Sequence, residues 1–299
     1  MSESALLSGR PSVANTRRNP VEHGNRAGLY RAHPLRRRRA VDQAKVICFL
    51  APRDADFVKS VTMTQPEEMT MATYVLVHGS NQGGWIWQPV TNRLRVAGHQ
   101  VYAPSLDGCG ERKGQMRPGI TAETQADEVA QLMFYEDLKD VVLVGTSYGG
   151  MVACRTAELM RERISRLVFV DALTLFDGEK VADILPHSTA VADGVTLRPS
   201  PEDVANRLFA DLDPKTRVWA LERYTPHPIA FRFQPVKLDS FWSQQWRASV
   251  IWCRRAPNPG EAHQRRAAER LGAKWAELDT GHYPMLSTPA ELTTLLTAG

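Results

Sequence analysis

A serine flanked by glycines, between an apolar run and a run of small residues, constrains this chain more than any other feature. Val141–Val144 is apolar and mostly β-branched, and it leads directly into Gly145-Thr146-Ser147-Tyr148-Gly149. The small residues that follow, from Gly150 to Ala157, suit a helix. A strand, the motif Gly-x-Ser-x-Gly and a helix are what a nucleophile elbow needs, since the glycines let strand and helix approach closely. The pattern predicts that Ser147 is presented on a sharp turn at a helix N-terminus, which favours a developing negative charge.

Strand and helix patterns alternate from Thr73 onward, and this predicts an α/β fold with a mainly parallel sheet and helices on both faces. The interval from about Thr174 to Lys237 breaks the rhythm with many prolines, scattered aromatic residues and one amphipathic stretch, Pro201–Asp211. The predicted strands are Thr73–Val77, Gln100–Ala103, Val141–Val144, Leu167–Val170, Ser249–Trp252 and Lys274–Leu278. The predicted helices lie near Gln88–Ala97, Thr121–Phe134, Tyr148–Met160, Ala262–Leu271 and Pro289–Thr297.

Two further loops carry residues that could act with Ser147. The first predicted strand runs into a glycine-rich turn, where the backbone N–H of Ser80 is the expected second oxyanion donor beside the N–H of Tyr148. The last predicted strand leads into a loop that carries His282. A histidine at this position can reach back to the serine and act as its general base.

The other histidines and the cysteines suggest no separate site. We expect structural roles for His99, His187, His227 and His263. The cysteines are widely spaced and form no metal-binding pattern, so free and mostly buried thiols in a reducing cytoplasm are expected. These cysteines are Cys48, Cys109, Cys154 and Cys253.

The net charge of +4 comes from the start of the chain, because Met1–Gln43 holds nine arginines against Glu3, Glu22 and Asp42. Its composition and lack of periodicity predict a disordered, arginine-rich extension over residues 1–68, followed by one domain over residues 69–299. Arg36–Arg39 could instead be a nucleic-acid or targeting patch, or upstream sequence ahead of a later start. We expect neither a nucleic-acid partner nor a membrane span, since no apolar run approaches the roughly 20 residues that a span needs.

Taken together, these motifs resemble the α/β-hydrolase superfamily, and within it the branch of plant methyl-ester esterases, hydroxynitrile lyases and their bacterial relatives. The resemblance covers about Ala72 to Thr297 and implies that the insertion at about 174–237 is a small helical cap over the serine. Such a cap excludes water and supplies apolar walls. The residues that carry the resemblance, besides the elbow, are Val75–Gly79, Trp85–Trp87, Gly98–Pro104, Leu278–His282, Met285–Ser287 and Pro289.

The acidic member of a catalytic triad is where the sequence departs from these relatives. In most of the family an aspartate follows the penultimate strand, but Ala256 stands at that position here. We predict that Asp171, directly after the fourth strand, orients His282 instead; the alternative is that Asp171 only caps the turn into the insertion. Asp279 is a weaker candidate, because it stands too close to His282 in the sequence to reach behind the ring.

The sequence therefore predicts a serine hydrolase that cleaves a small, fairly apolar carboxylic ester, thioester or lactone through an acyl-enzyme, without cofactor or metal. The alternatives are a lyase that cleaves carbon–carbon bonds and a non-catalytic ligand-binding protein of the same fold. In the plant lyases a lysine follows the catalytic histidine and a threonine replaces the glycine of His-Gly, whereas this chain has Tyr283 and Gly79. The expected partner is a small-molecule ester, and a homodimer stays open.

Overall fold

The computed structural model describes residues 71–185, 190–256 and 258–298. By its internal contacts the chain divides into two units, Met1–Met63 and Thr64–Gly299, and all of the described residues belong to the second. The predictions for residues 1–68, Arg36–Arg39, Cys48 and His187 lie outside the described residues. Within them, no helix is both long and apolar enough to cross a bilayer.

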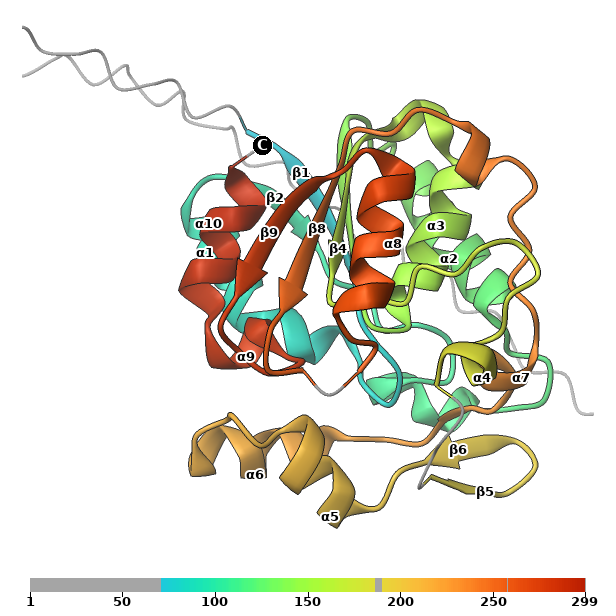
Figure 1. Ribbon diagram of the computed structural model, residues 1–299, viewed down its shortest axis with the longest axis vertical. Coiled ribbons are helices and arrows are strands. Elements are labelled where there is room, and N and C mark those ends of the chain that lie inside the picture. Colours follow the sequence, from blue (N-terminus) through green and yellow to red (C-terminus); the bar gives the residue numbers. More distant parts are fainter. Residues whose placement is uncertain (1–70, 186–189, 257, 299) are drawn as a thin grey trace, which may run out of the picture. The chain divides into compact units, whose positions relative to one another are not determined.

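A parallel sheet of six strands forms the centre of the fold, in the order β2-β1-β3-β4-β8-β9 (Figure 1). Its central register pairs Val75 with Leu143 and Leu143 with Leu167. The six predicted strands are confirmed with small shifts of their ends, the largest at β4, which begins three residues earlier than expected. The strands are β1 Thr73–Val77, β2 Gln100–Tyr102, β3 Val141–Thr146, β4 Ile164–Val170, β8 Ala248–Cys253 and β9 Lys274–Leu278.

Helices cover both faces of this sheet, as predicted: α2, α3 and α8 lie on one side and α1 and α10 on the other (Figure 1). Local signals set their ends, since Thr121 and Thr124 form a capping box at the start of α2. Gly272 ends α8 in the left-handed conformation that glycine adopts readily. The helices are α1 Gln88–Val96, α2 Ala122–Tyr135, α3 Gly149–Leu159, α8 Glu261–Leu271, α9 Pro284–Ser287 and α10 Pro289–Thr297.

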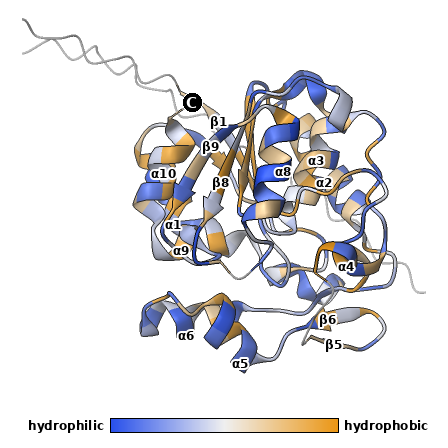
Figure 2. Cartoon of the chain, in the orientation of Figure 1, coloured by the Kyte–Doolittle hydropathy of each residue, from blue (hydrophilic) through white to orange (hydrophobic). Residues whose placement is uncertain are grey.

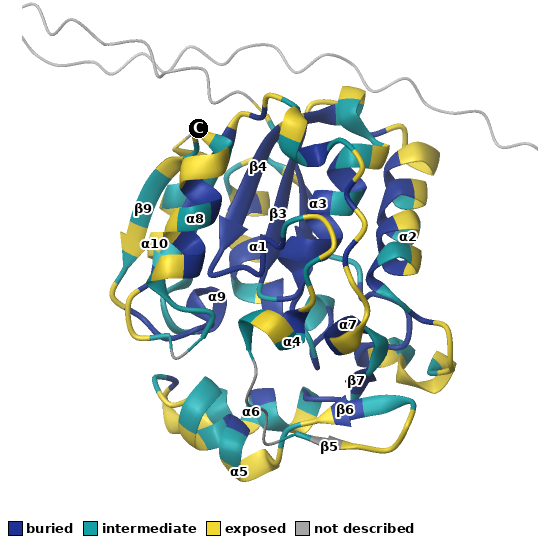
Figure 3. Ribbon diagram, turned by 45° about the vertical axis from the view of Figure 1, so that its right-hand side comes forward, coloured by how far each residue is buried: buried dark blue, intermediate teal, exposed yellow. Residues whose placement is uncertain are grey.

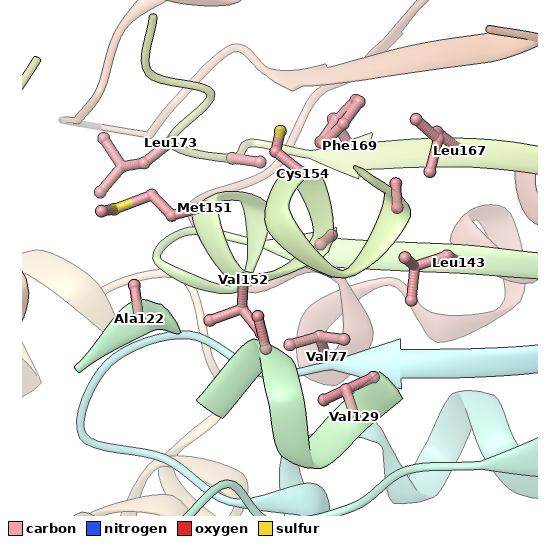
Figure 4. Close-up of a cluster of buried hydrophobic side chains, with 14 of the residues drawn as sticks. Val77, Ala122, Val129, Leu143, Met151, Val152, Cys154, Leu167, Phe169 and Leu173 are labelled. Atoms are coloured by element: carbon pink, nitrogen blue, oxygen red, sulfur yellow. The ribbon is translucent and has the colours of Figure 1, made fainter. Parts of the chain in front are cut away.

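Alternate residues of each strand point into two separate cores. Val75 and Val77 of β1 pack with α2 and α3, whereas Tyr74 and Leu76 pack on the opposite face with α1 and α10. Figure 4 shows the first core, where Val77, Leu143 and Leu167 of neighbouring strands meet side chains of α3. Strand β3 is buried along its whole length and its neighbours β1 and β4 over most of theirs (Figure 3), and these strands are hydrophobic (Figure 2), as expected for strands covered on both faces.

Between β4 and β8 the chain leaves the sheet and forms the segment 174–247, which we call the cap segment. Figure 1 places α5 and α6 of this segment beyond the ends of the strands to which the arrowheads point. It holds the expected short helices, and the amphipathic stretch Pro201–Asp211 is helical only as far as Leu208. It also contains a three-stranded antiparallel sheet, β5-β6-β7, which the sequence analysis did not anticipate. The elements are α4 Val181–Ile184, β5 Val191–Ala192, β6 Thr196–Arg198, α5 Pro201–Asp203, η4 Val204–Leu208, α6 Pro214–Arg223, β7 His227–Pro228, α7 Ala230–Phe233 and η5 Phe241–Ser243.

Candidate active site

The turn between β3 and α3 places Ser147 in a backbone conformation that residues other than glycine rarely adopt, with φ of +50°. The two glycines of the motif make the turn sterically possible. A Cβ atom on Gly149 would lie 2.5 Å from the carbonyl oxygen of Val77, and one on Gly145 would lie 2.5 Å from the carbonyl oxygen of Gly149. The strand and the helix are therefore as close as the sequence motif predicts for a nucleophile elbow.

The structure brings His282 and Asp171 together, 111 residues apart in the chain. The imidazole Nδ1 of His282 lies 2.5 Å from the carboxylate Oδ2 of Asp171, and both side chains are buried, with Asp171 0% and His282 5% exposed. Burial raises the pKa of the Asp171 carboxyl, and the hydrogen bond and charge of His282 act in the opposite direction. This carboxylate fixes the ring so that Nδ1 carries the proton and Nε2 is an acceptor.

Asp171 itself sits at a strained position, with φ of +43° at the end of β4. Its backbone N–H donates to the carbonyl oxygen of Ile251 in β8, at 2.9 Å, so the neighbouring strand holds the residue in place. Strained residues of this kind cluster at functional sites, and the carboxylate of this one contacts His282.

Ser147, His282 and Ser80 all line one cavity with a volume of about 640 Å³. Each follows the carboxyl end of a parallel strand: Ser80 follows β1, Ser147 follows β3 and His282 follows β9. The carboxyl ends of parallel strands meet at one edge of a sheet, which is where ligands bind in open α/β folds.

Two backbone N–H groups beside the serine are available as donors. Within the described residues, the N–H groups of Ser80 and Tyr148 donate to no acceptor of the protein. The loop that carries Ser80 is close to the nucleophile, because a Cβ atom on Gly79 would lie only 2.8 Å from the Cβ of Ser147. Donors in this arrangement suit an oxyanion that forms on a substrate attacked by Ser147.

The cap segment supplies most of the cavity wall. Among the aromatic residues scattered through this segment, Tyr224 and Phe231 line the cavity, whereas Trp219 packs against Trp85 with ring centroids 5.3 Å apart. Two arginines of this wall, Arg207 and Arg232, were not among the residues predicted for the site. The four-residue spacing of Asp203 and Arg207 is a signal for an ion pair on one helical turn, and their side chains lie 2.6 Å apart. The cap residues that line the cavity are Val181, Leu185, Ala190, Leu197, Pro199, Asp203, Arg207, Leu208, Tyr224, Phe231 and Arg232.

Neither alternative position supplies a carboxylate to His282. The side chain of Asp279 is 65% exposed and lies 3.6 Å from Arg254 and 3.5 Å from Arg255, the two arginines that follow β8. Ala256, at the position of the family's usual aspartate, offers no carboxylate. The described structure therefore leaves Asp171 as the partner of His282.

The three described histidines for which structural roles were predicted each accept a hydrogen bond from a backbone N–H group. These bonds join Ala72 to His99, Asn81 to His227 and Thr174 to His263. Burial lowers the pKa of His263 to about 4, with a further contribution from Arg266. His227 is also held neutral by burial, which lowers its pKa. These contacts give the three histidines the structural roles expected from the sequence.

The described cysteines are also poorly suited to act as nucleophiles. Cys109, Cys154 and Cys253 are free and buried, and burial raises the pKa of Cys109 to about 12. No group of His, Cys, Asp and Glu side chains that could hold a metal ion occurs in the part of the chain that the structure describes.

Comparison with known proteins agrees with this geometry. Residues 74–294 match the family model described as "Alpha/beta hydrolase family". The chain is 30% identical over 245 residues to the carbendazim hydrolyzing esterase of Nocardioides sp. (strain SG-4G), a match that covers 76% of this chain and 99% of that protein. It is 26% identical over 245 residues to the polyneuridine aldehyde esterase of Rauvolfia serpentina, which covers 73% of this chain and 92% of that protein.

A solved structure shares the same fold. An extracellular alpha/beta-hydrolase from a Paenibacillus species superposes with a TM-score of 0.67 at 24% identity, covering 75% of this chain and 97% of that one. These matches confirm the resemblance to the superfamily and to its esterase branch that the motifs indicated.

Proposed function

Because this chain belongs to the α/β hydrolase family, we propose that it hydrolyses a small, fairly apolar carboxylic ester through an acyl-enzyme on Ser147. The observation that carries this proposal is the buried pair of Asp171 and His282, of which His282 lines the same cavity as a serine held at positive φ. These are the parts that nucleophilic acyl transfer needs: a nucleophile, a base and a group that orients the base.

In the proposed reaction the Ser147 hydroxyl oxygen attacks the ester carbonyl while Nε2 of His282 takes the hydroxyl proton. Asp171 stays ionised and stabilises the imidazolium through Nδ1. The N–H groups of Ser80 and Tyr148 donate to the oxyanion of the tetrahedral intermediate. When the carbon–oxygen bond breaks, His282 gives its proton to the leaving alcohol and an ester of Ser147 remains.

Water then releases the acid. His282 takes a proton from the water molecule, whose oxygen attacks the acyl carbonyl, and the second tetrahedral intermediate collapses. The proton returns to the Ser147 oxygen as its bond to the acyl group breaks, which restores the free enzyme. Each step uses the same base and the same donors, and none requires a metal or a cofactor.

The cavity supports a small substrate with an apolar body. Its volume of about 640 Å³ lies in the range of roughly 300–1,000 Å³ found for small-molecule sites. Leu173, Leu185, Leu197, Leu208 and Phe231 give it apolar walls. The relatives named above include esterases for carbendazim and polyneuridine aldehyde, and both names fit small substrates.

The test combines covalent labelling with turnover. Wild-type protein should react with a fluorophosphonate probe on Ser147 and hydrolyse p-nitrophenyl esters, with shorter acyl chains favoured by the limited volume. Ser147→Ala should lose both the label and the turnover. If Ser147→Ala still hydrolysed these esters or still took the label at another residue, the nucleophile assignment would be wrong.

The lyase alternative has less support. A threonine in place of Gly79, as in the plant lyases, would need a shift of its surroundings, because its Cβ would lie 2.8 Å from the Cβ of Ser147. Tyr283, at the position of the lyase lysine, is buried and packs against Phe209. Both residues favour ester hydrolysis in this chain.

A further inference from the structure

A carboxylate of the cap segment contacts the loop that carries His282. Asp211 lies between η4 and α6, 70 residues before Gly281. Its Oδ2 accepts a hydrogen bond of 2.7 Å from the backbone N–H of Gly281 and one of 2.9 Å from the Thr280 hydroxyl. Gly281 and Thr280 are the two residues directly before His282, so the contact acts on the backbone that carries the imidazole.

The glycine at position 281 is explained by this contact. A Cβ atom there would lie 2.6 Å from Oδ1, 2.7 Å from Cγ and 2.9 Å from Oδ2 of Asp211. The backbone of Gly281 is not in the left-handed region, so an alanine could adopt its conformation. Any side chain at this position would push the carboxylate away and break both hydrogen bonds.

The Thr280 hydroxyl extends the contact into the loop. Its oxygen also lies 2.6 Å from the Ser287 hydroxyl, and because Thr280 donates its one proton to Asp211, it accepts from Ser287. On the other side of the histidine, the ring of Phe209 lies 5.1 Å from that of Tyr283. The cap segment therefore contacts both residues that flank His282 in the sequence, Gly281 and Tyr283.

One oxygen of the Asp211 carboxylate accepts both of these hydrogen bonds. Its second oxygen, Oδ1, is buried and meets no donor among the described residues. An unpaired buried carboxylate oxygen costs free energy, and such groups persist where another requirement outweighs that cost. Hydrogen bonds to an ionised carboxylate are short and strong, which suits a contact that must hold a loop in one position.

We propose that Asp211 is a positioning residue, which holds the backbone before His282 and so keeps the imidazole aligned with Ser147. This inference rests on the proposed function, because it assumes that His282 is the base. Asp171 fixes the imidazole at Nδ1, and Asp211 fixes the backbone from which the ring projects. The position of the cap segment is thereby coupled to the rate of the chemical step.

The experiment breaks the contact in two ways and measures kcat and KM with p-nitrophenyl acetate, along with the rate of fluorophosphonate labelling. Asp211→Ala removes the carboxylate and Gly281→Ala displaces it by steric contact. Each should lower kcat and the labelling rate about ten- to a hundred-fold, as expected for a base displaced by a fraction of an ångström, with KM within about twofold. The double variant should lose little more than either single variant, because both substitutions break one contact.

Asp213→Ala is the matched control. Asp213 is a cap-segment carboxylate two residues away that accepts from the N–H groups of Lys215 and Thr216 at the start of α6. Its loss removes a helix cap and should leave kcat within about twofold. If Asp211→Ala does not fold, Asp211→Asn, which retains one acceptor oxygen, should still lower kcat at least about threefold.

Two results would overturn the proposal. The first is a kcat within twofold of wild type in folded Asp211→Ala or, if that variant does not fold, in folded Asp211→Asn. The second is a double variant in which the fold-loss of kcat equals the product of the two single fold-losses. Failure of the proposed function looks different. In that case Ser147→Ala would keep its turnover, and the Asp211 variants would no longer report on a catalytic histidine.

Discussion

Two residues of the proposed triad, Ser147 and Asp171, have strained backbone conformations. Residues other than glycine at positive φ cost of the order of 1–3 kcal/mol each. Hydrogen bonds from the surrounding chain hold them, since the Ser147 carbonyl oxygen accepts from Gly150 at 3.0 Å and from Leu173 at 2.8 Å. Asn81, Asp137 and Asp140 also have positive φ, but Ser147 and Asp171 are the two whose side-chain directions matter most for the proposed chemistry.

At this scale, Asp171→Asn tests the orienting acid. The amide would keep the shape of the side chain but would present the wrong partner to Nδ1, so the imidazole would lose its required tautomer. We expect kcat to fall by roughly four orders of magnitude with a near-normal fold, the size seen when triad aspartates are neutralised elsewhere. The measurement is steady-state hydrolysis with circular dichroism as the fold check.

Asp279→Asn is the control for that substitution, because Asp279 is exposed and lies beside Arg254 and Arg255. It should leave kcat within about twofold, as expected for a surface ion pair. A folded Asp171→Asn that kept more than about a tenth of the wild-type kcat would mean that another group orients His282.

At the scale of elements, the close approach of β1, β3 and α3 sets what the elbow tolerates. Gly149→Ala should lower the free energy of unfolding by about 2 kcal/mol or more, because its Cβ would lie 2.5 Å and 2.6 Å from the carbonyl oxygens of Val77 and His78. Backbone atoms in a sheet cannot move away cheaply. Gly114→Ala is the control, since a Cβ there meets no atom within 4 Å. Urea denaturation should separate the two variants, and equal stabilities would refute the steric explanation.

The strands of the sheet could be predicted from the sequence, but much of the structure of the cap segment could not. Runs such as Val141–Val144 are apolar because both faces of the sheet are covered, so their pattern is local and strong. By contrast, β5 and β7 have two residues each and form only through pairing with β6. Asp171 was predictable as a residue at a strand end. The contact of Asp211 with Gly281 was not, since it depends on how the cap segment folds back over the sheet.

For the described structure as a whole, buried histidines contribute to how stability depends on pH. Burial lowers the pKa values of His78 and His263 to about 4 and also lowers that of His227. The unfolded chain binds protons at these sites from about pH 6.5 downward. In the folded protein His78 and His263 do so only near pH 4, and His227 only well below pH 6.5. Stability should therefore fall as the pH decreases through this window. Asp171 acts in the opposite direction, because burial raises its pKa in the folded state.

His263→Gln isolates one of these contributions. His263 accepts from the Thr174 N–H at 3.1 Å, and the glutamine side-chain oxygen can take over this role without binding a proton. With a folded pKa of about 4, His263 should account for about 2 kcal/mol of the stability lost between pH 7 and pH 5. The variant should show a correspondingly smaller difference in urea denaturation at the two pH values. His99→Gln, which changes a partly exposed histidine, should alter the stability difference between pH 7 and pH 5 less than His263→Gln does. An unchanged pH dependence in His263→Gln would mean that His263 takes up its proton as readily in the folded protein as in the unfolded chain.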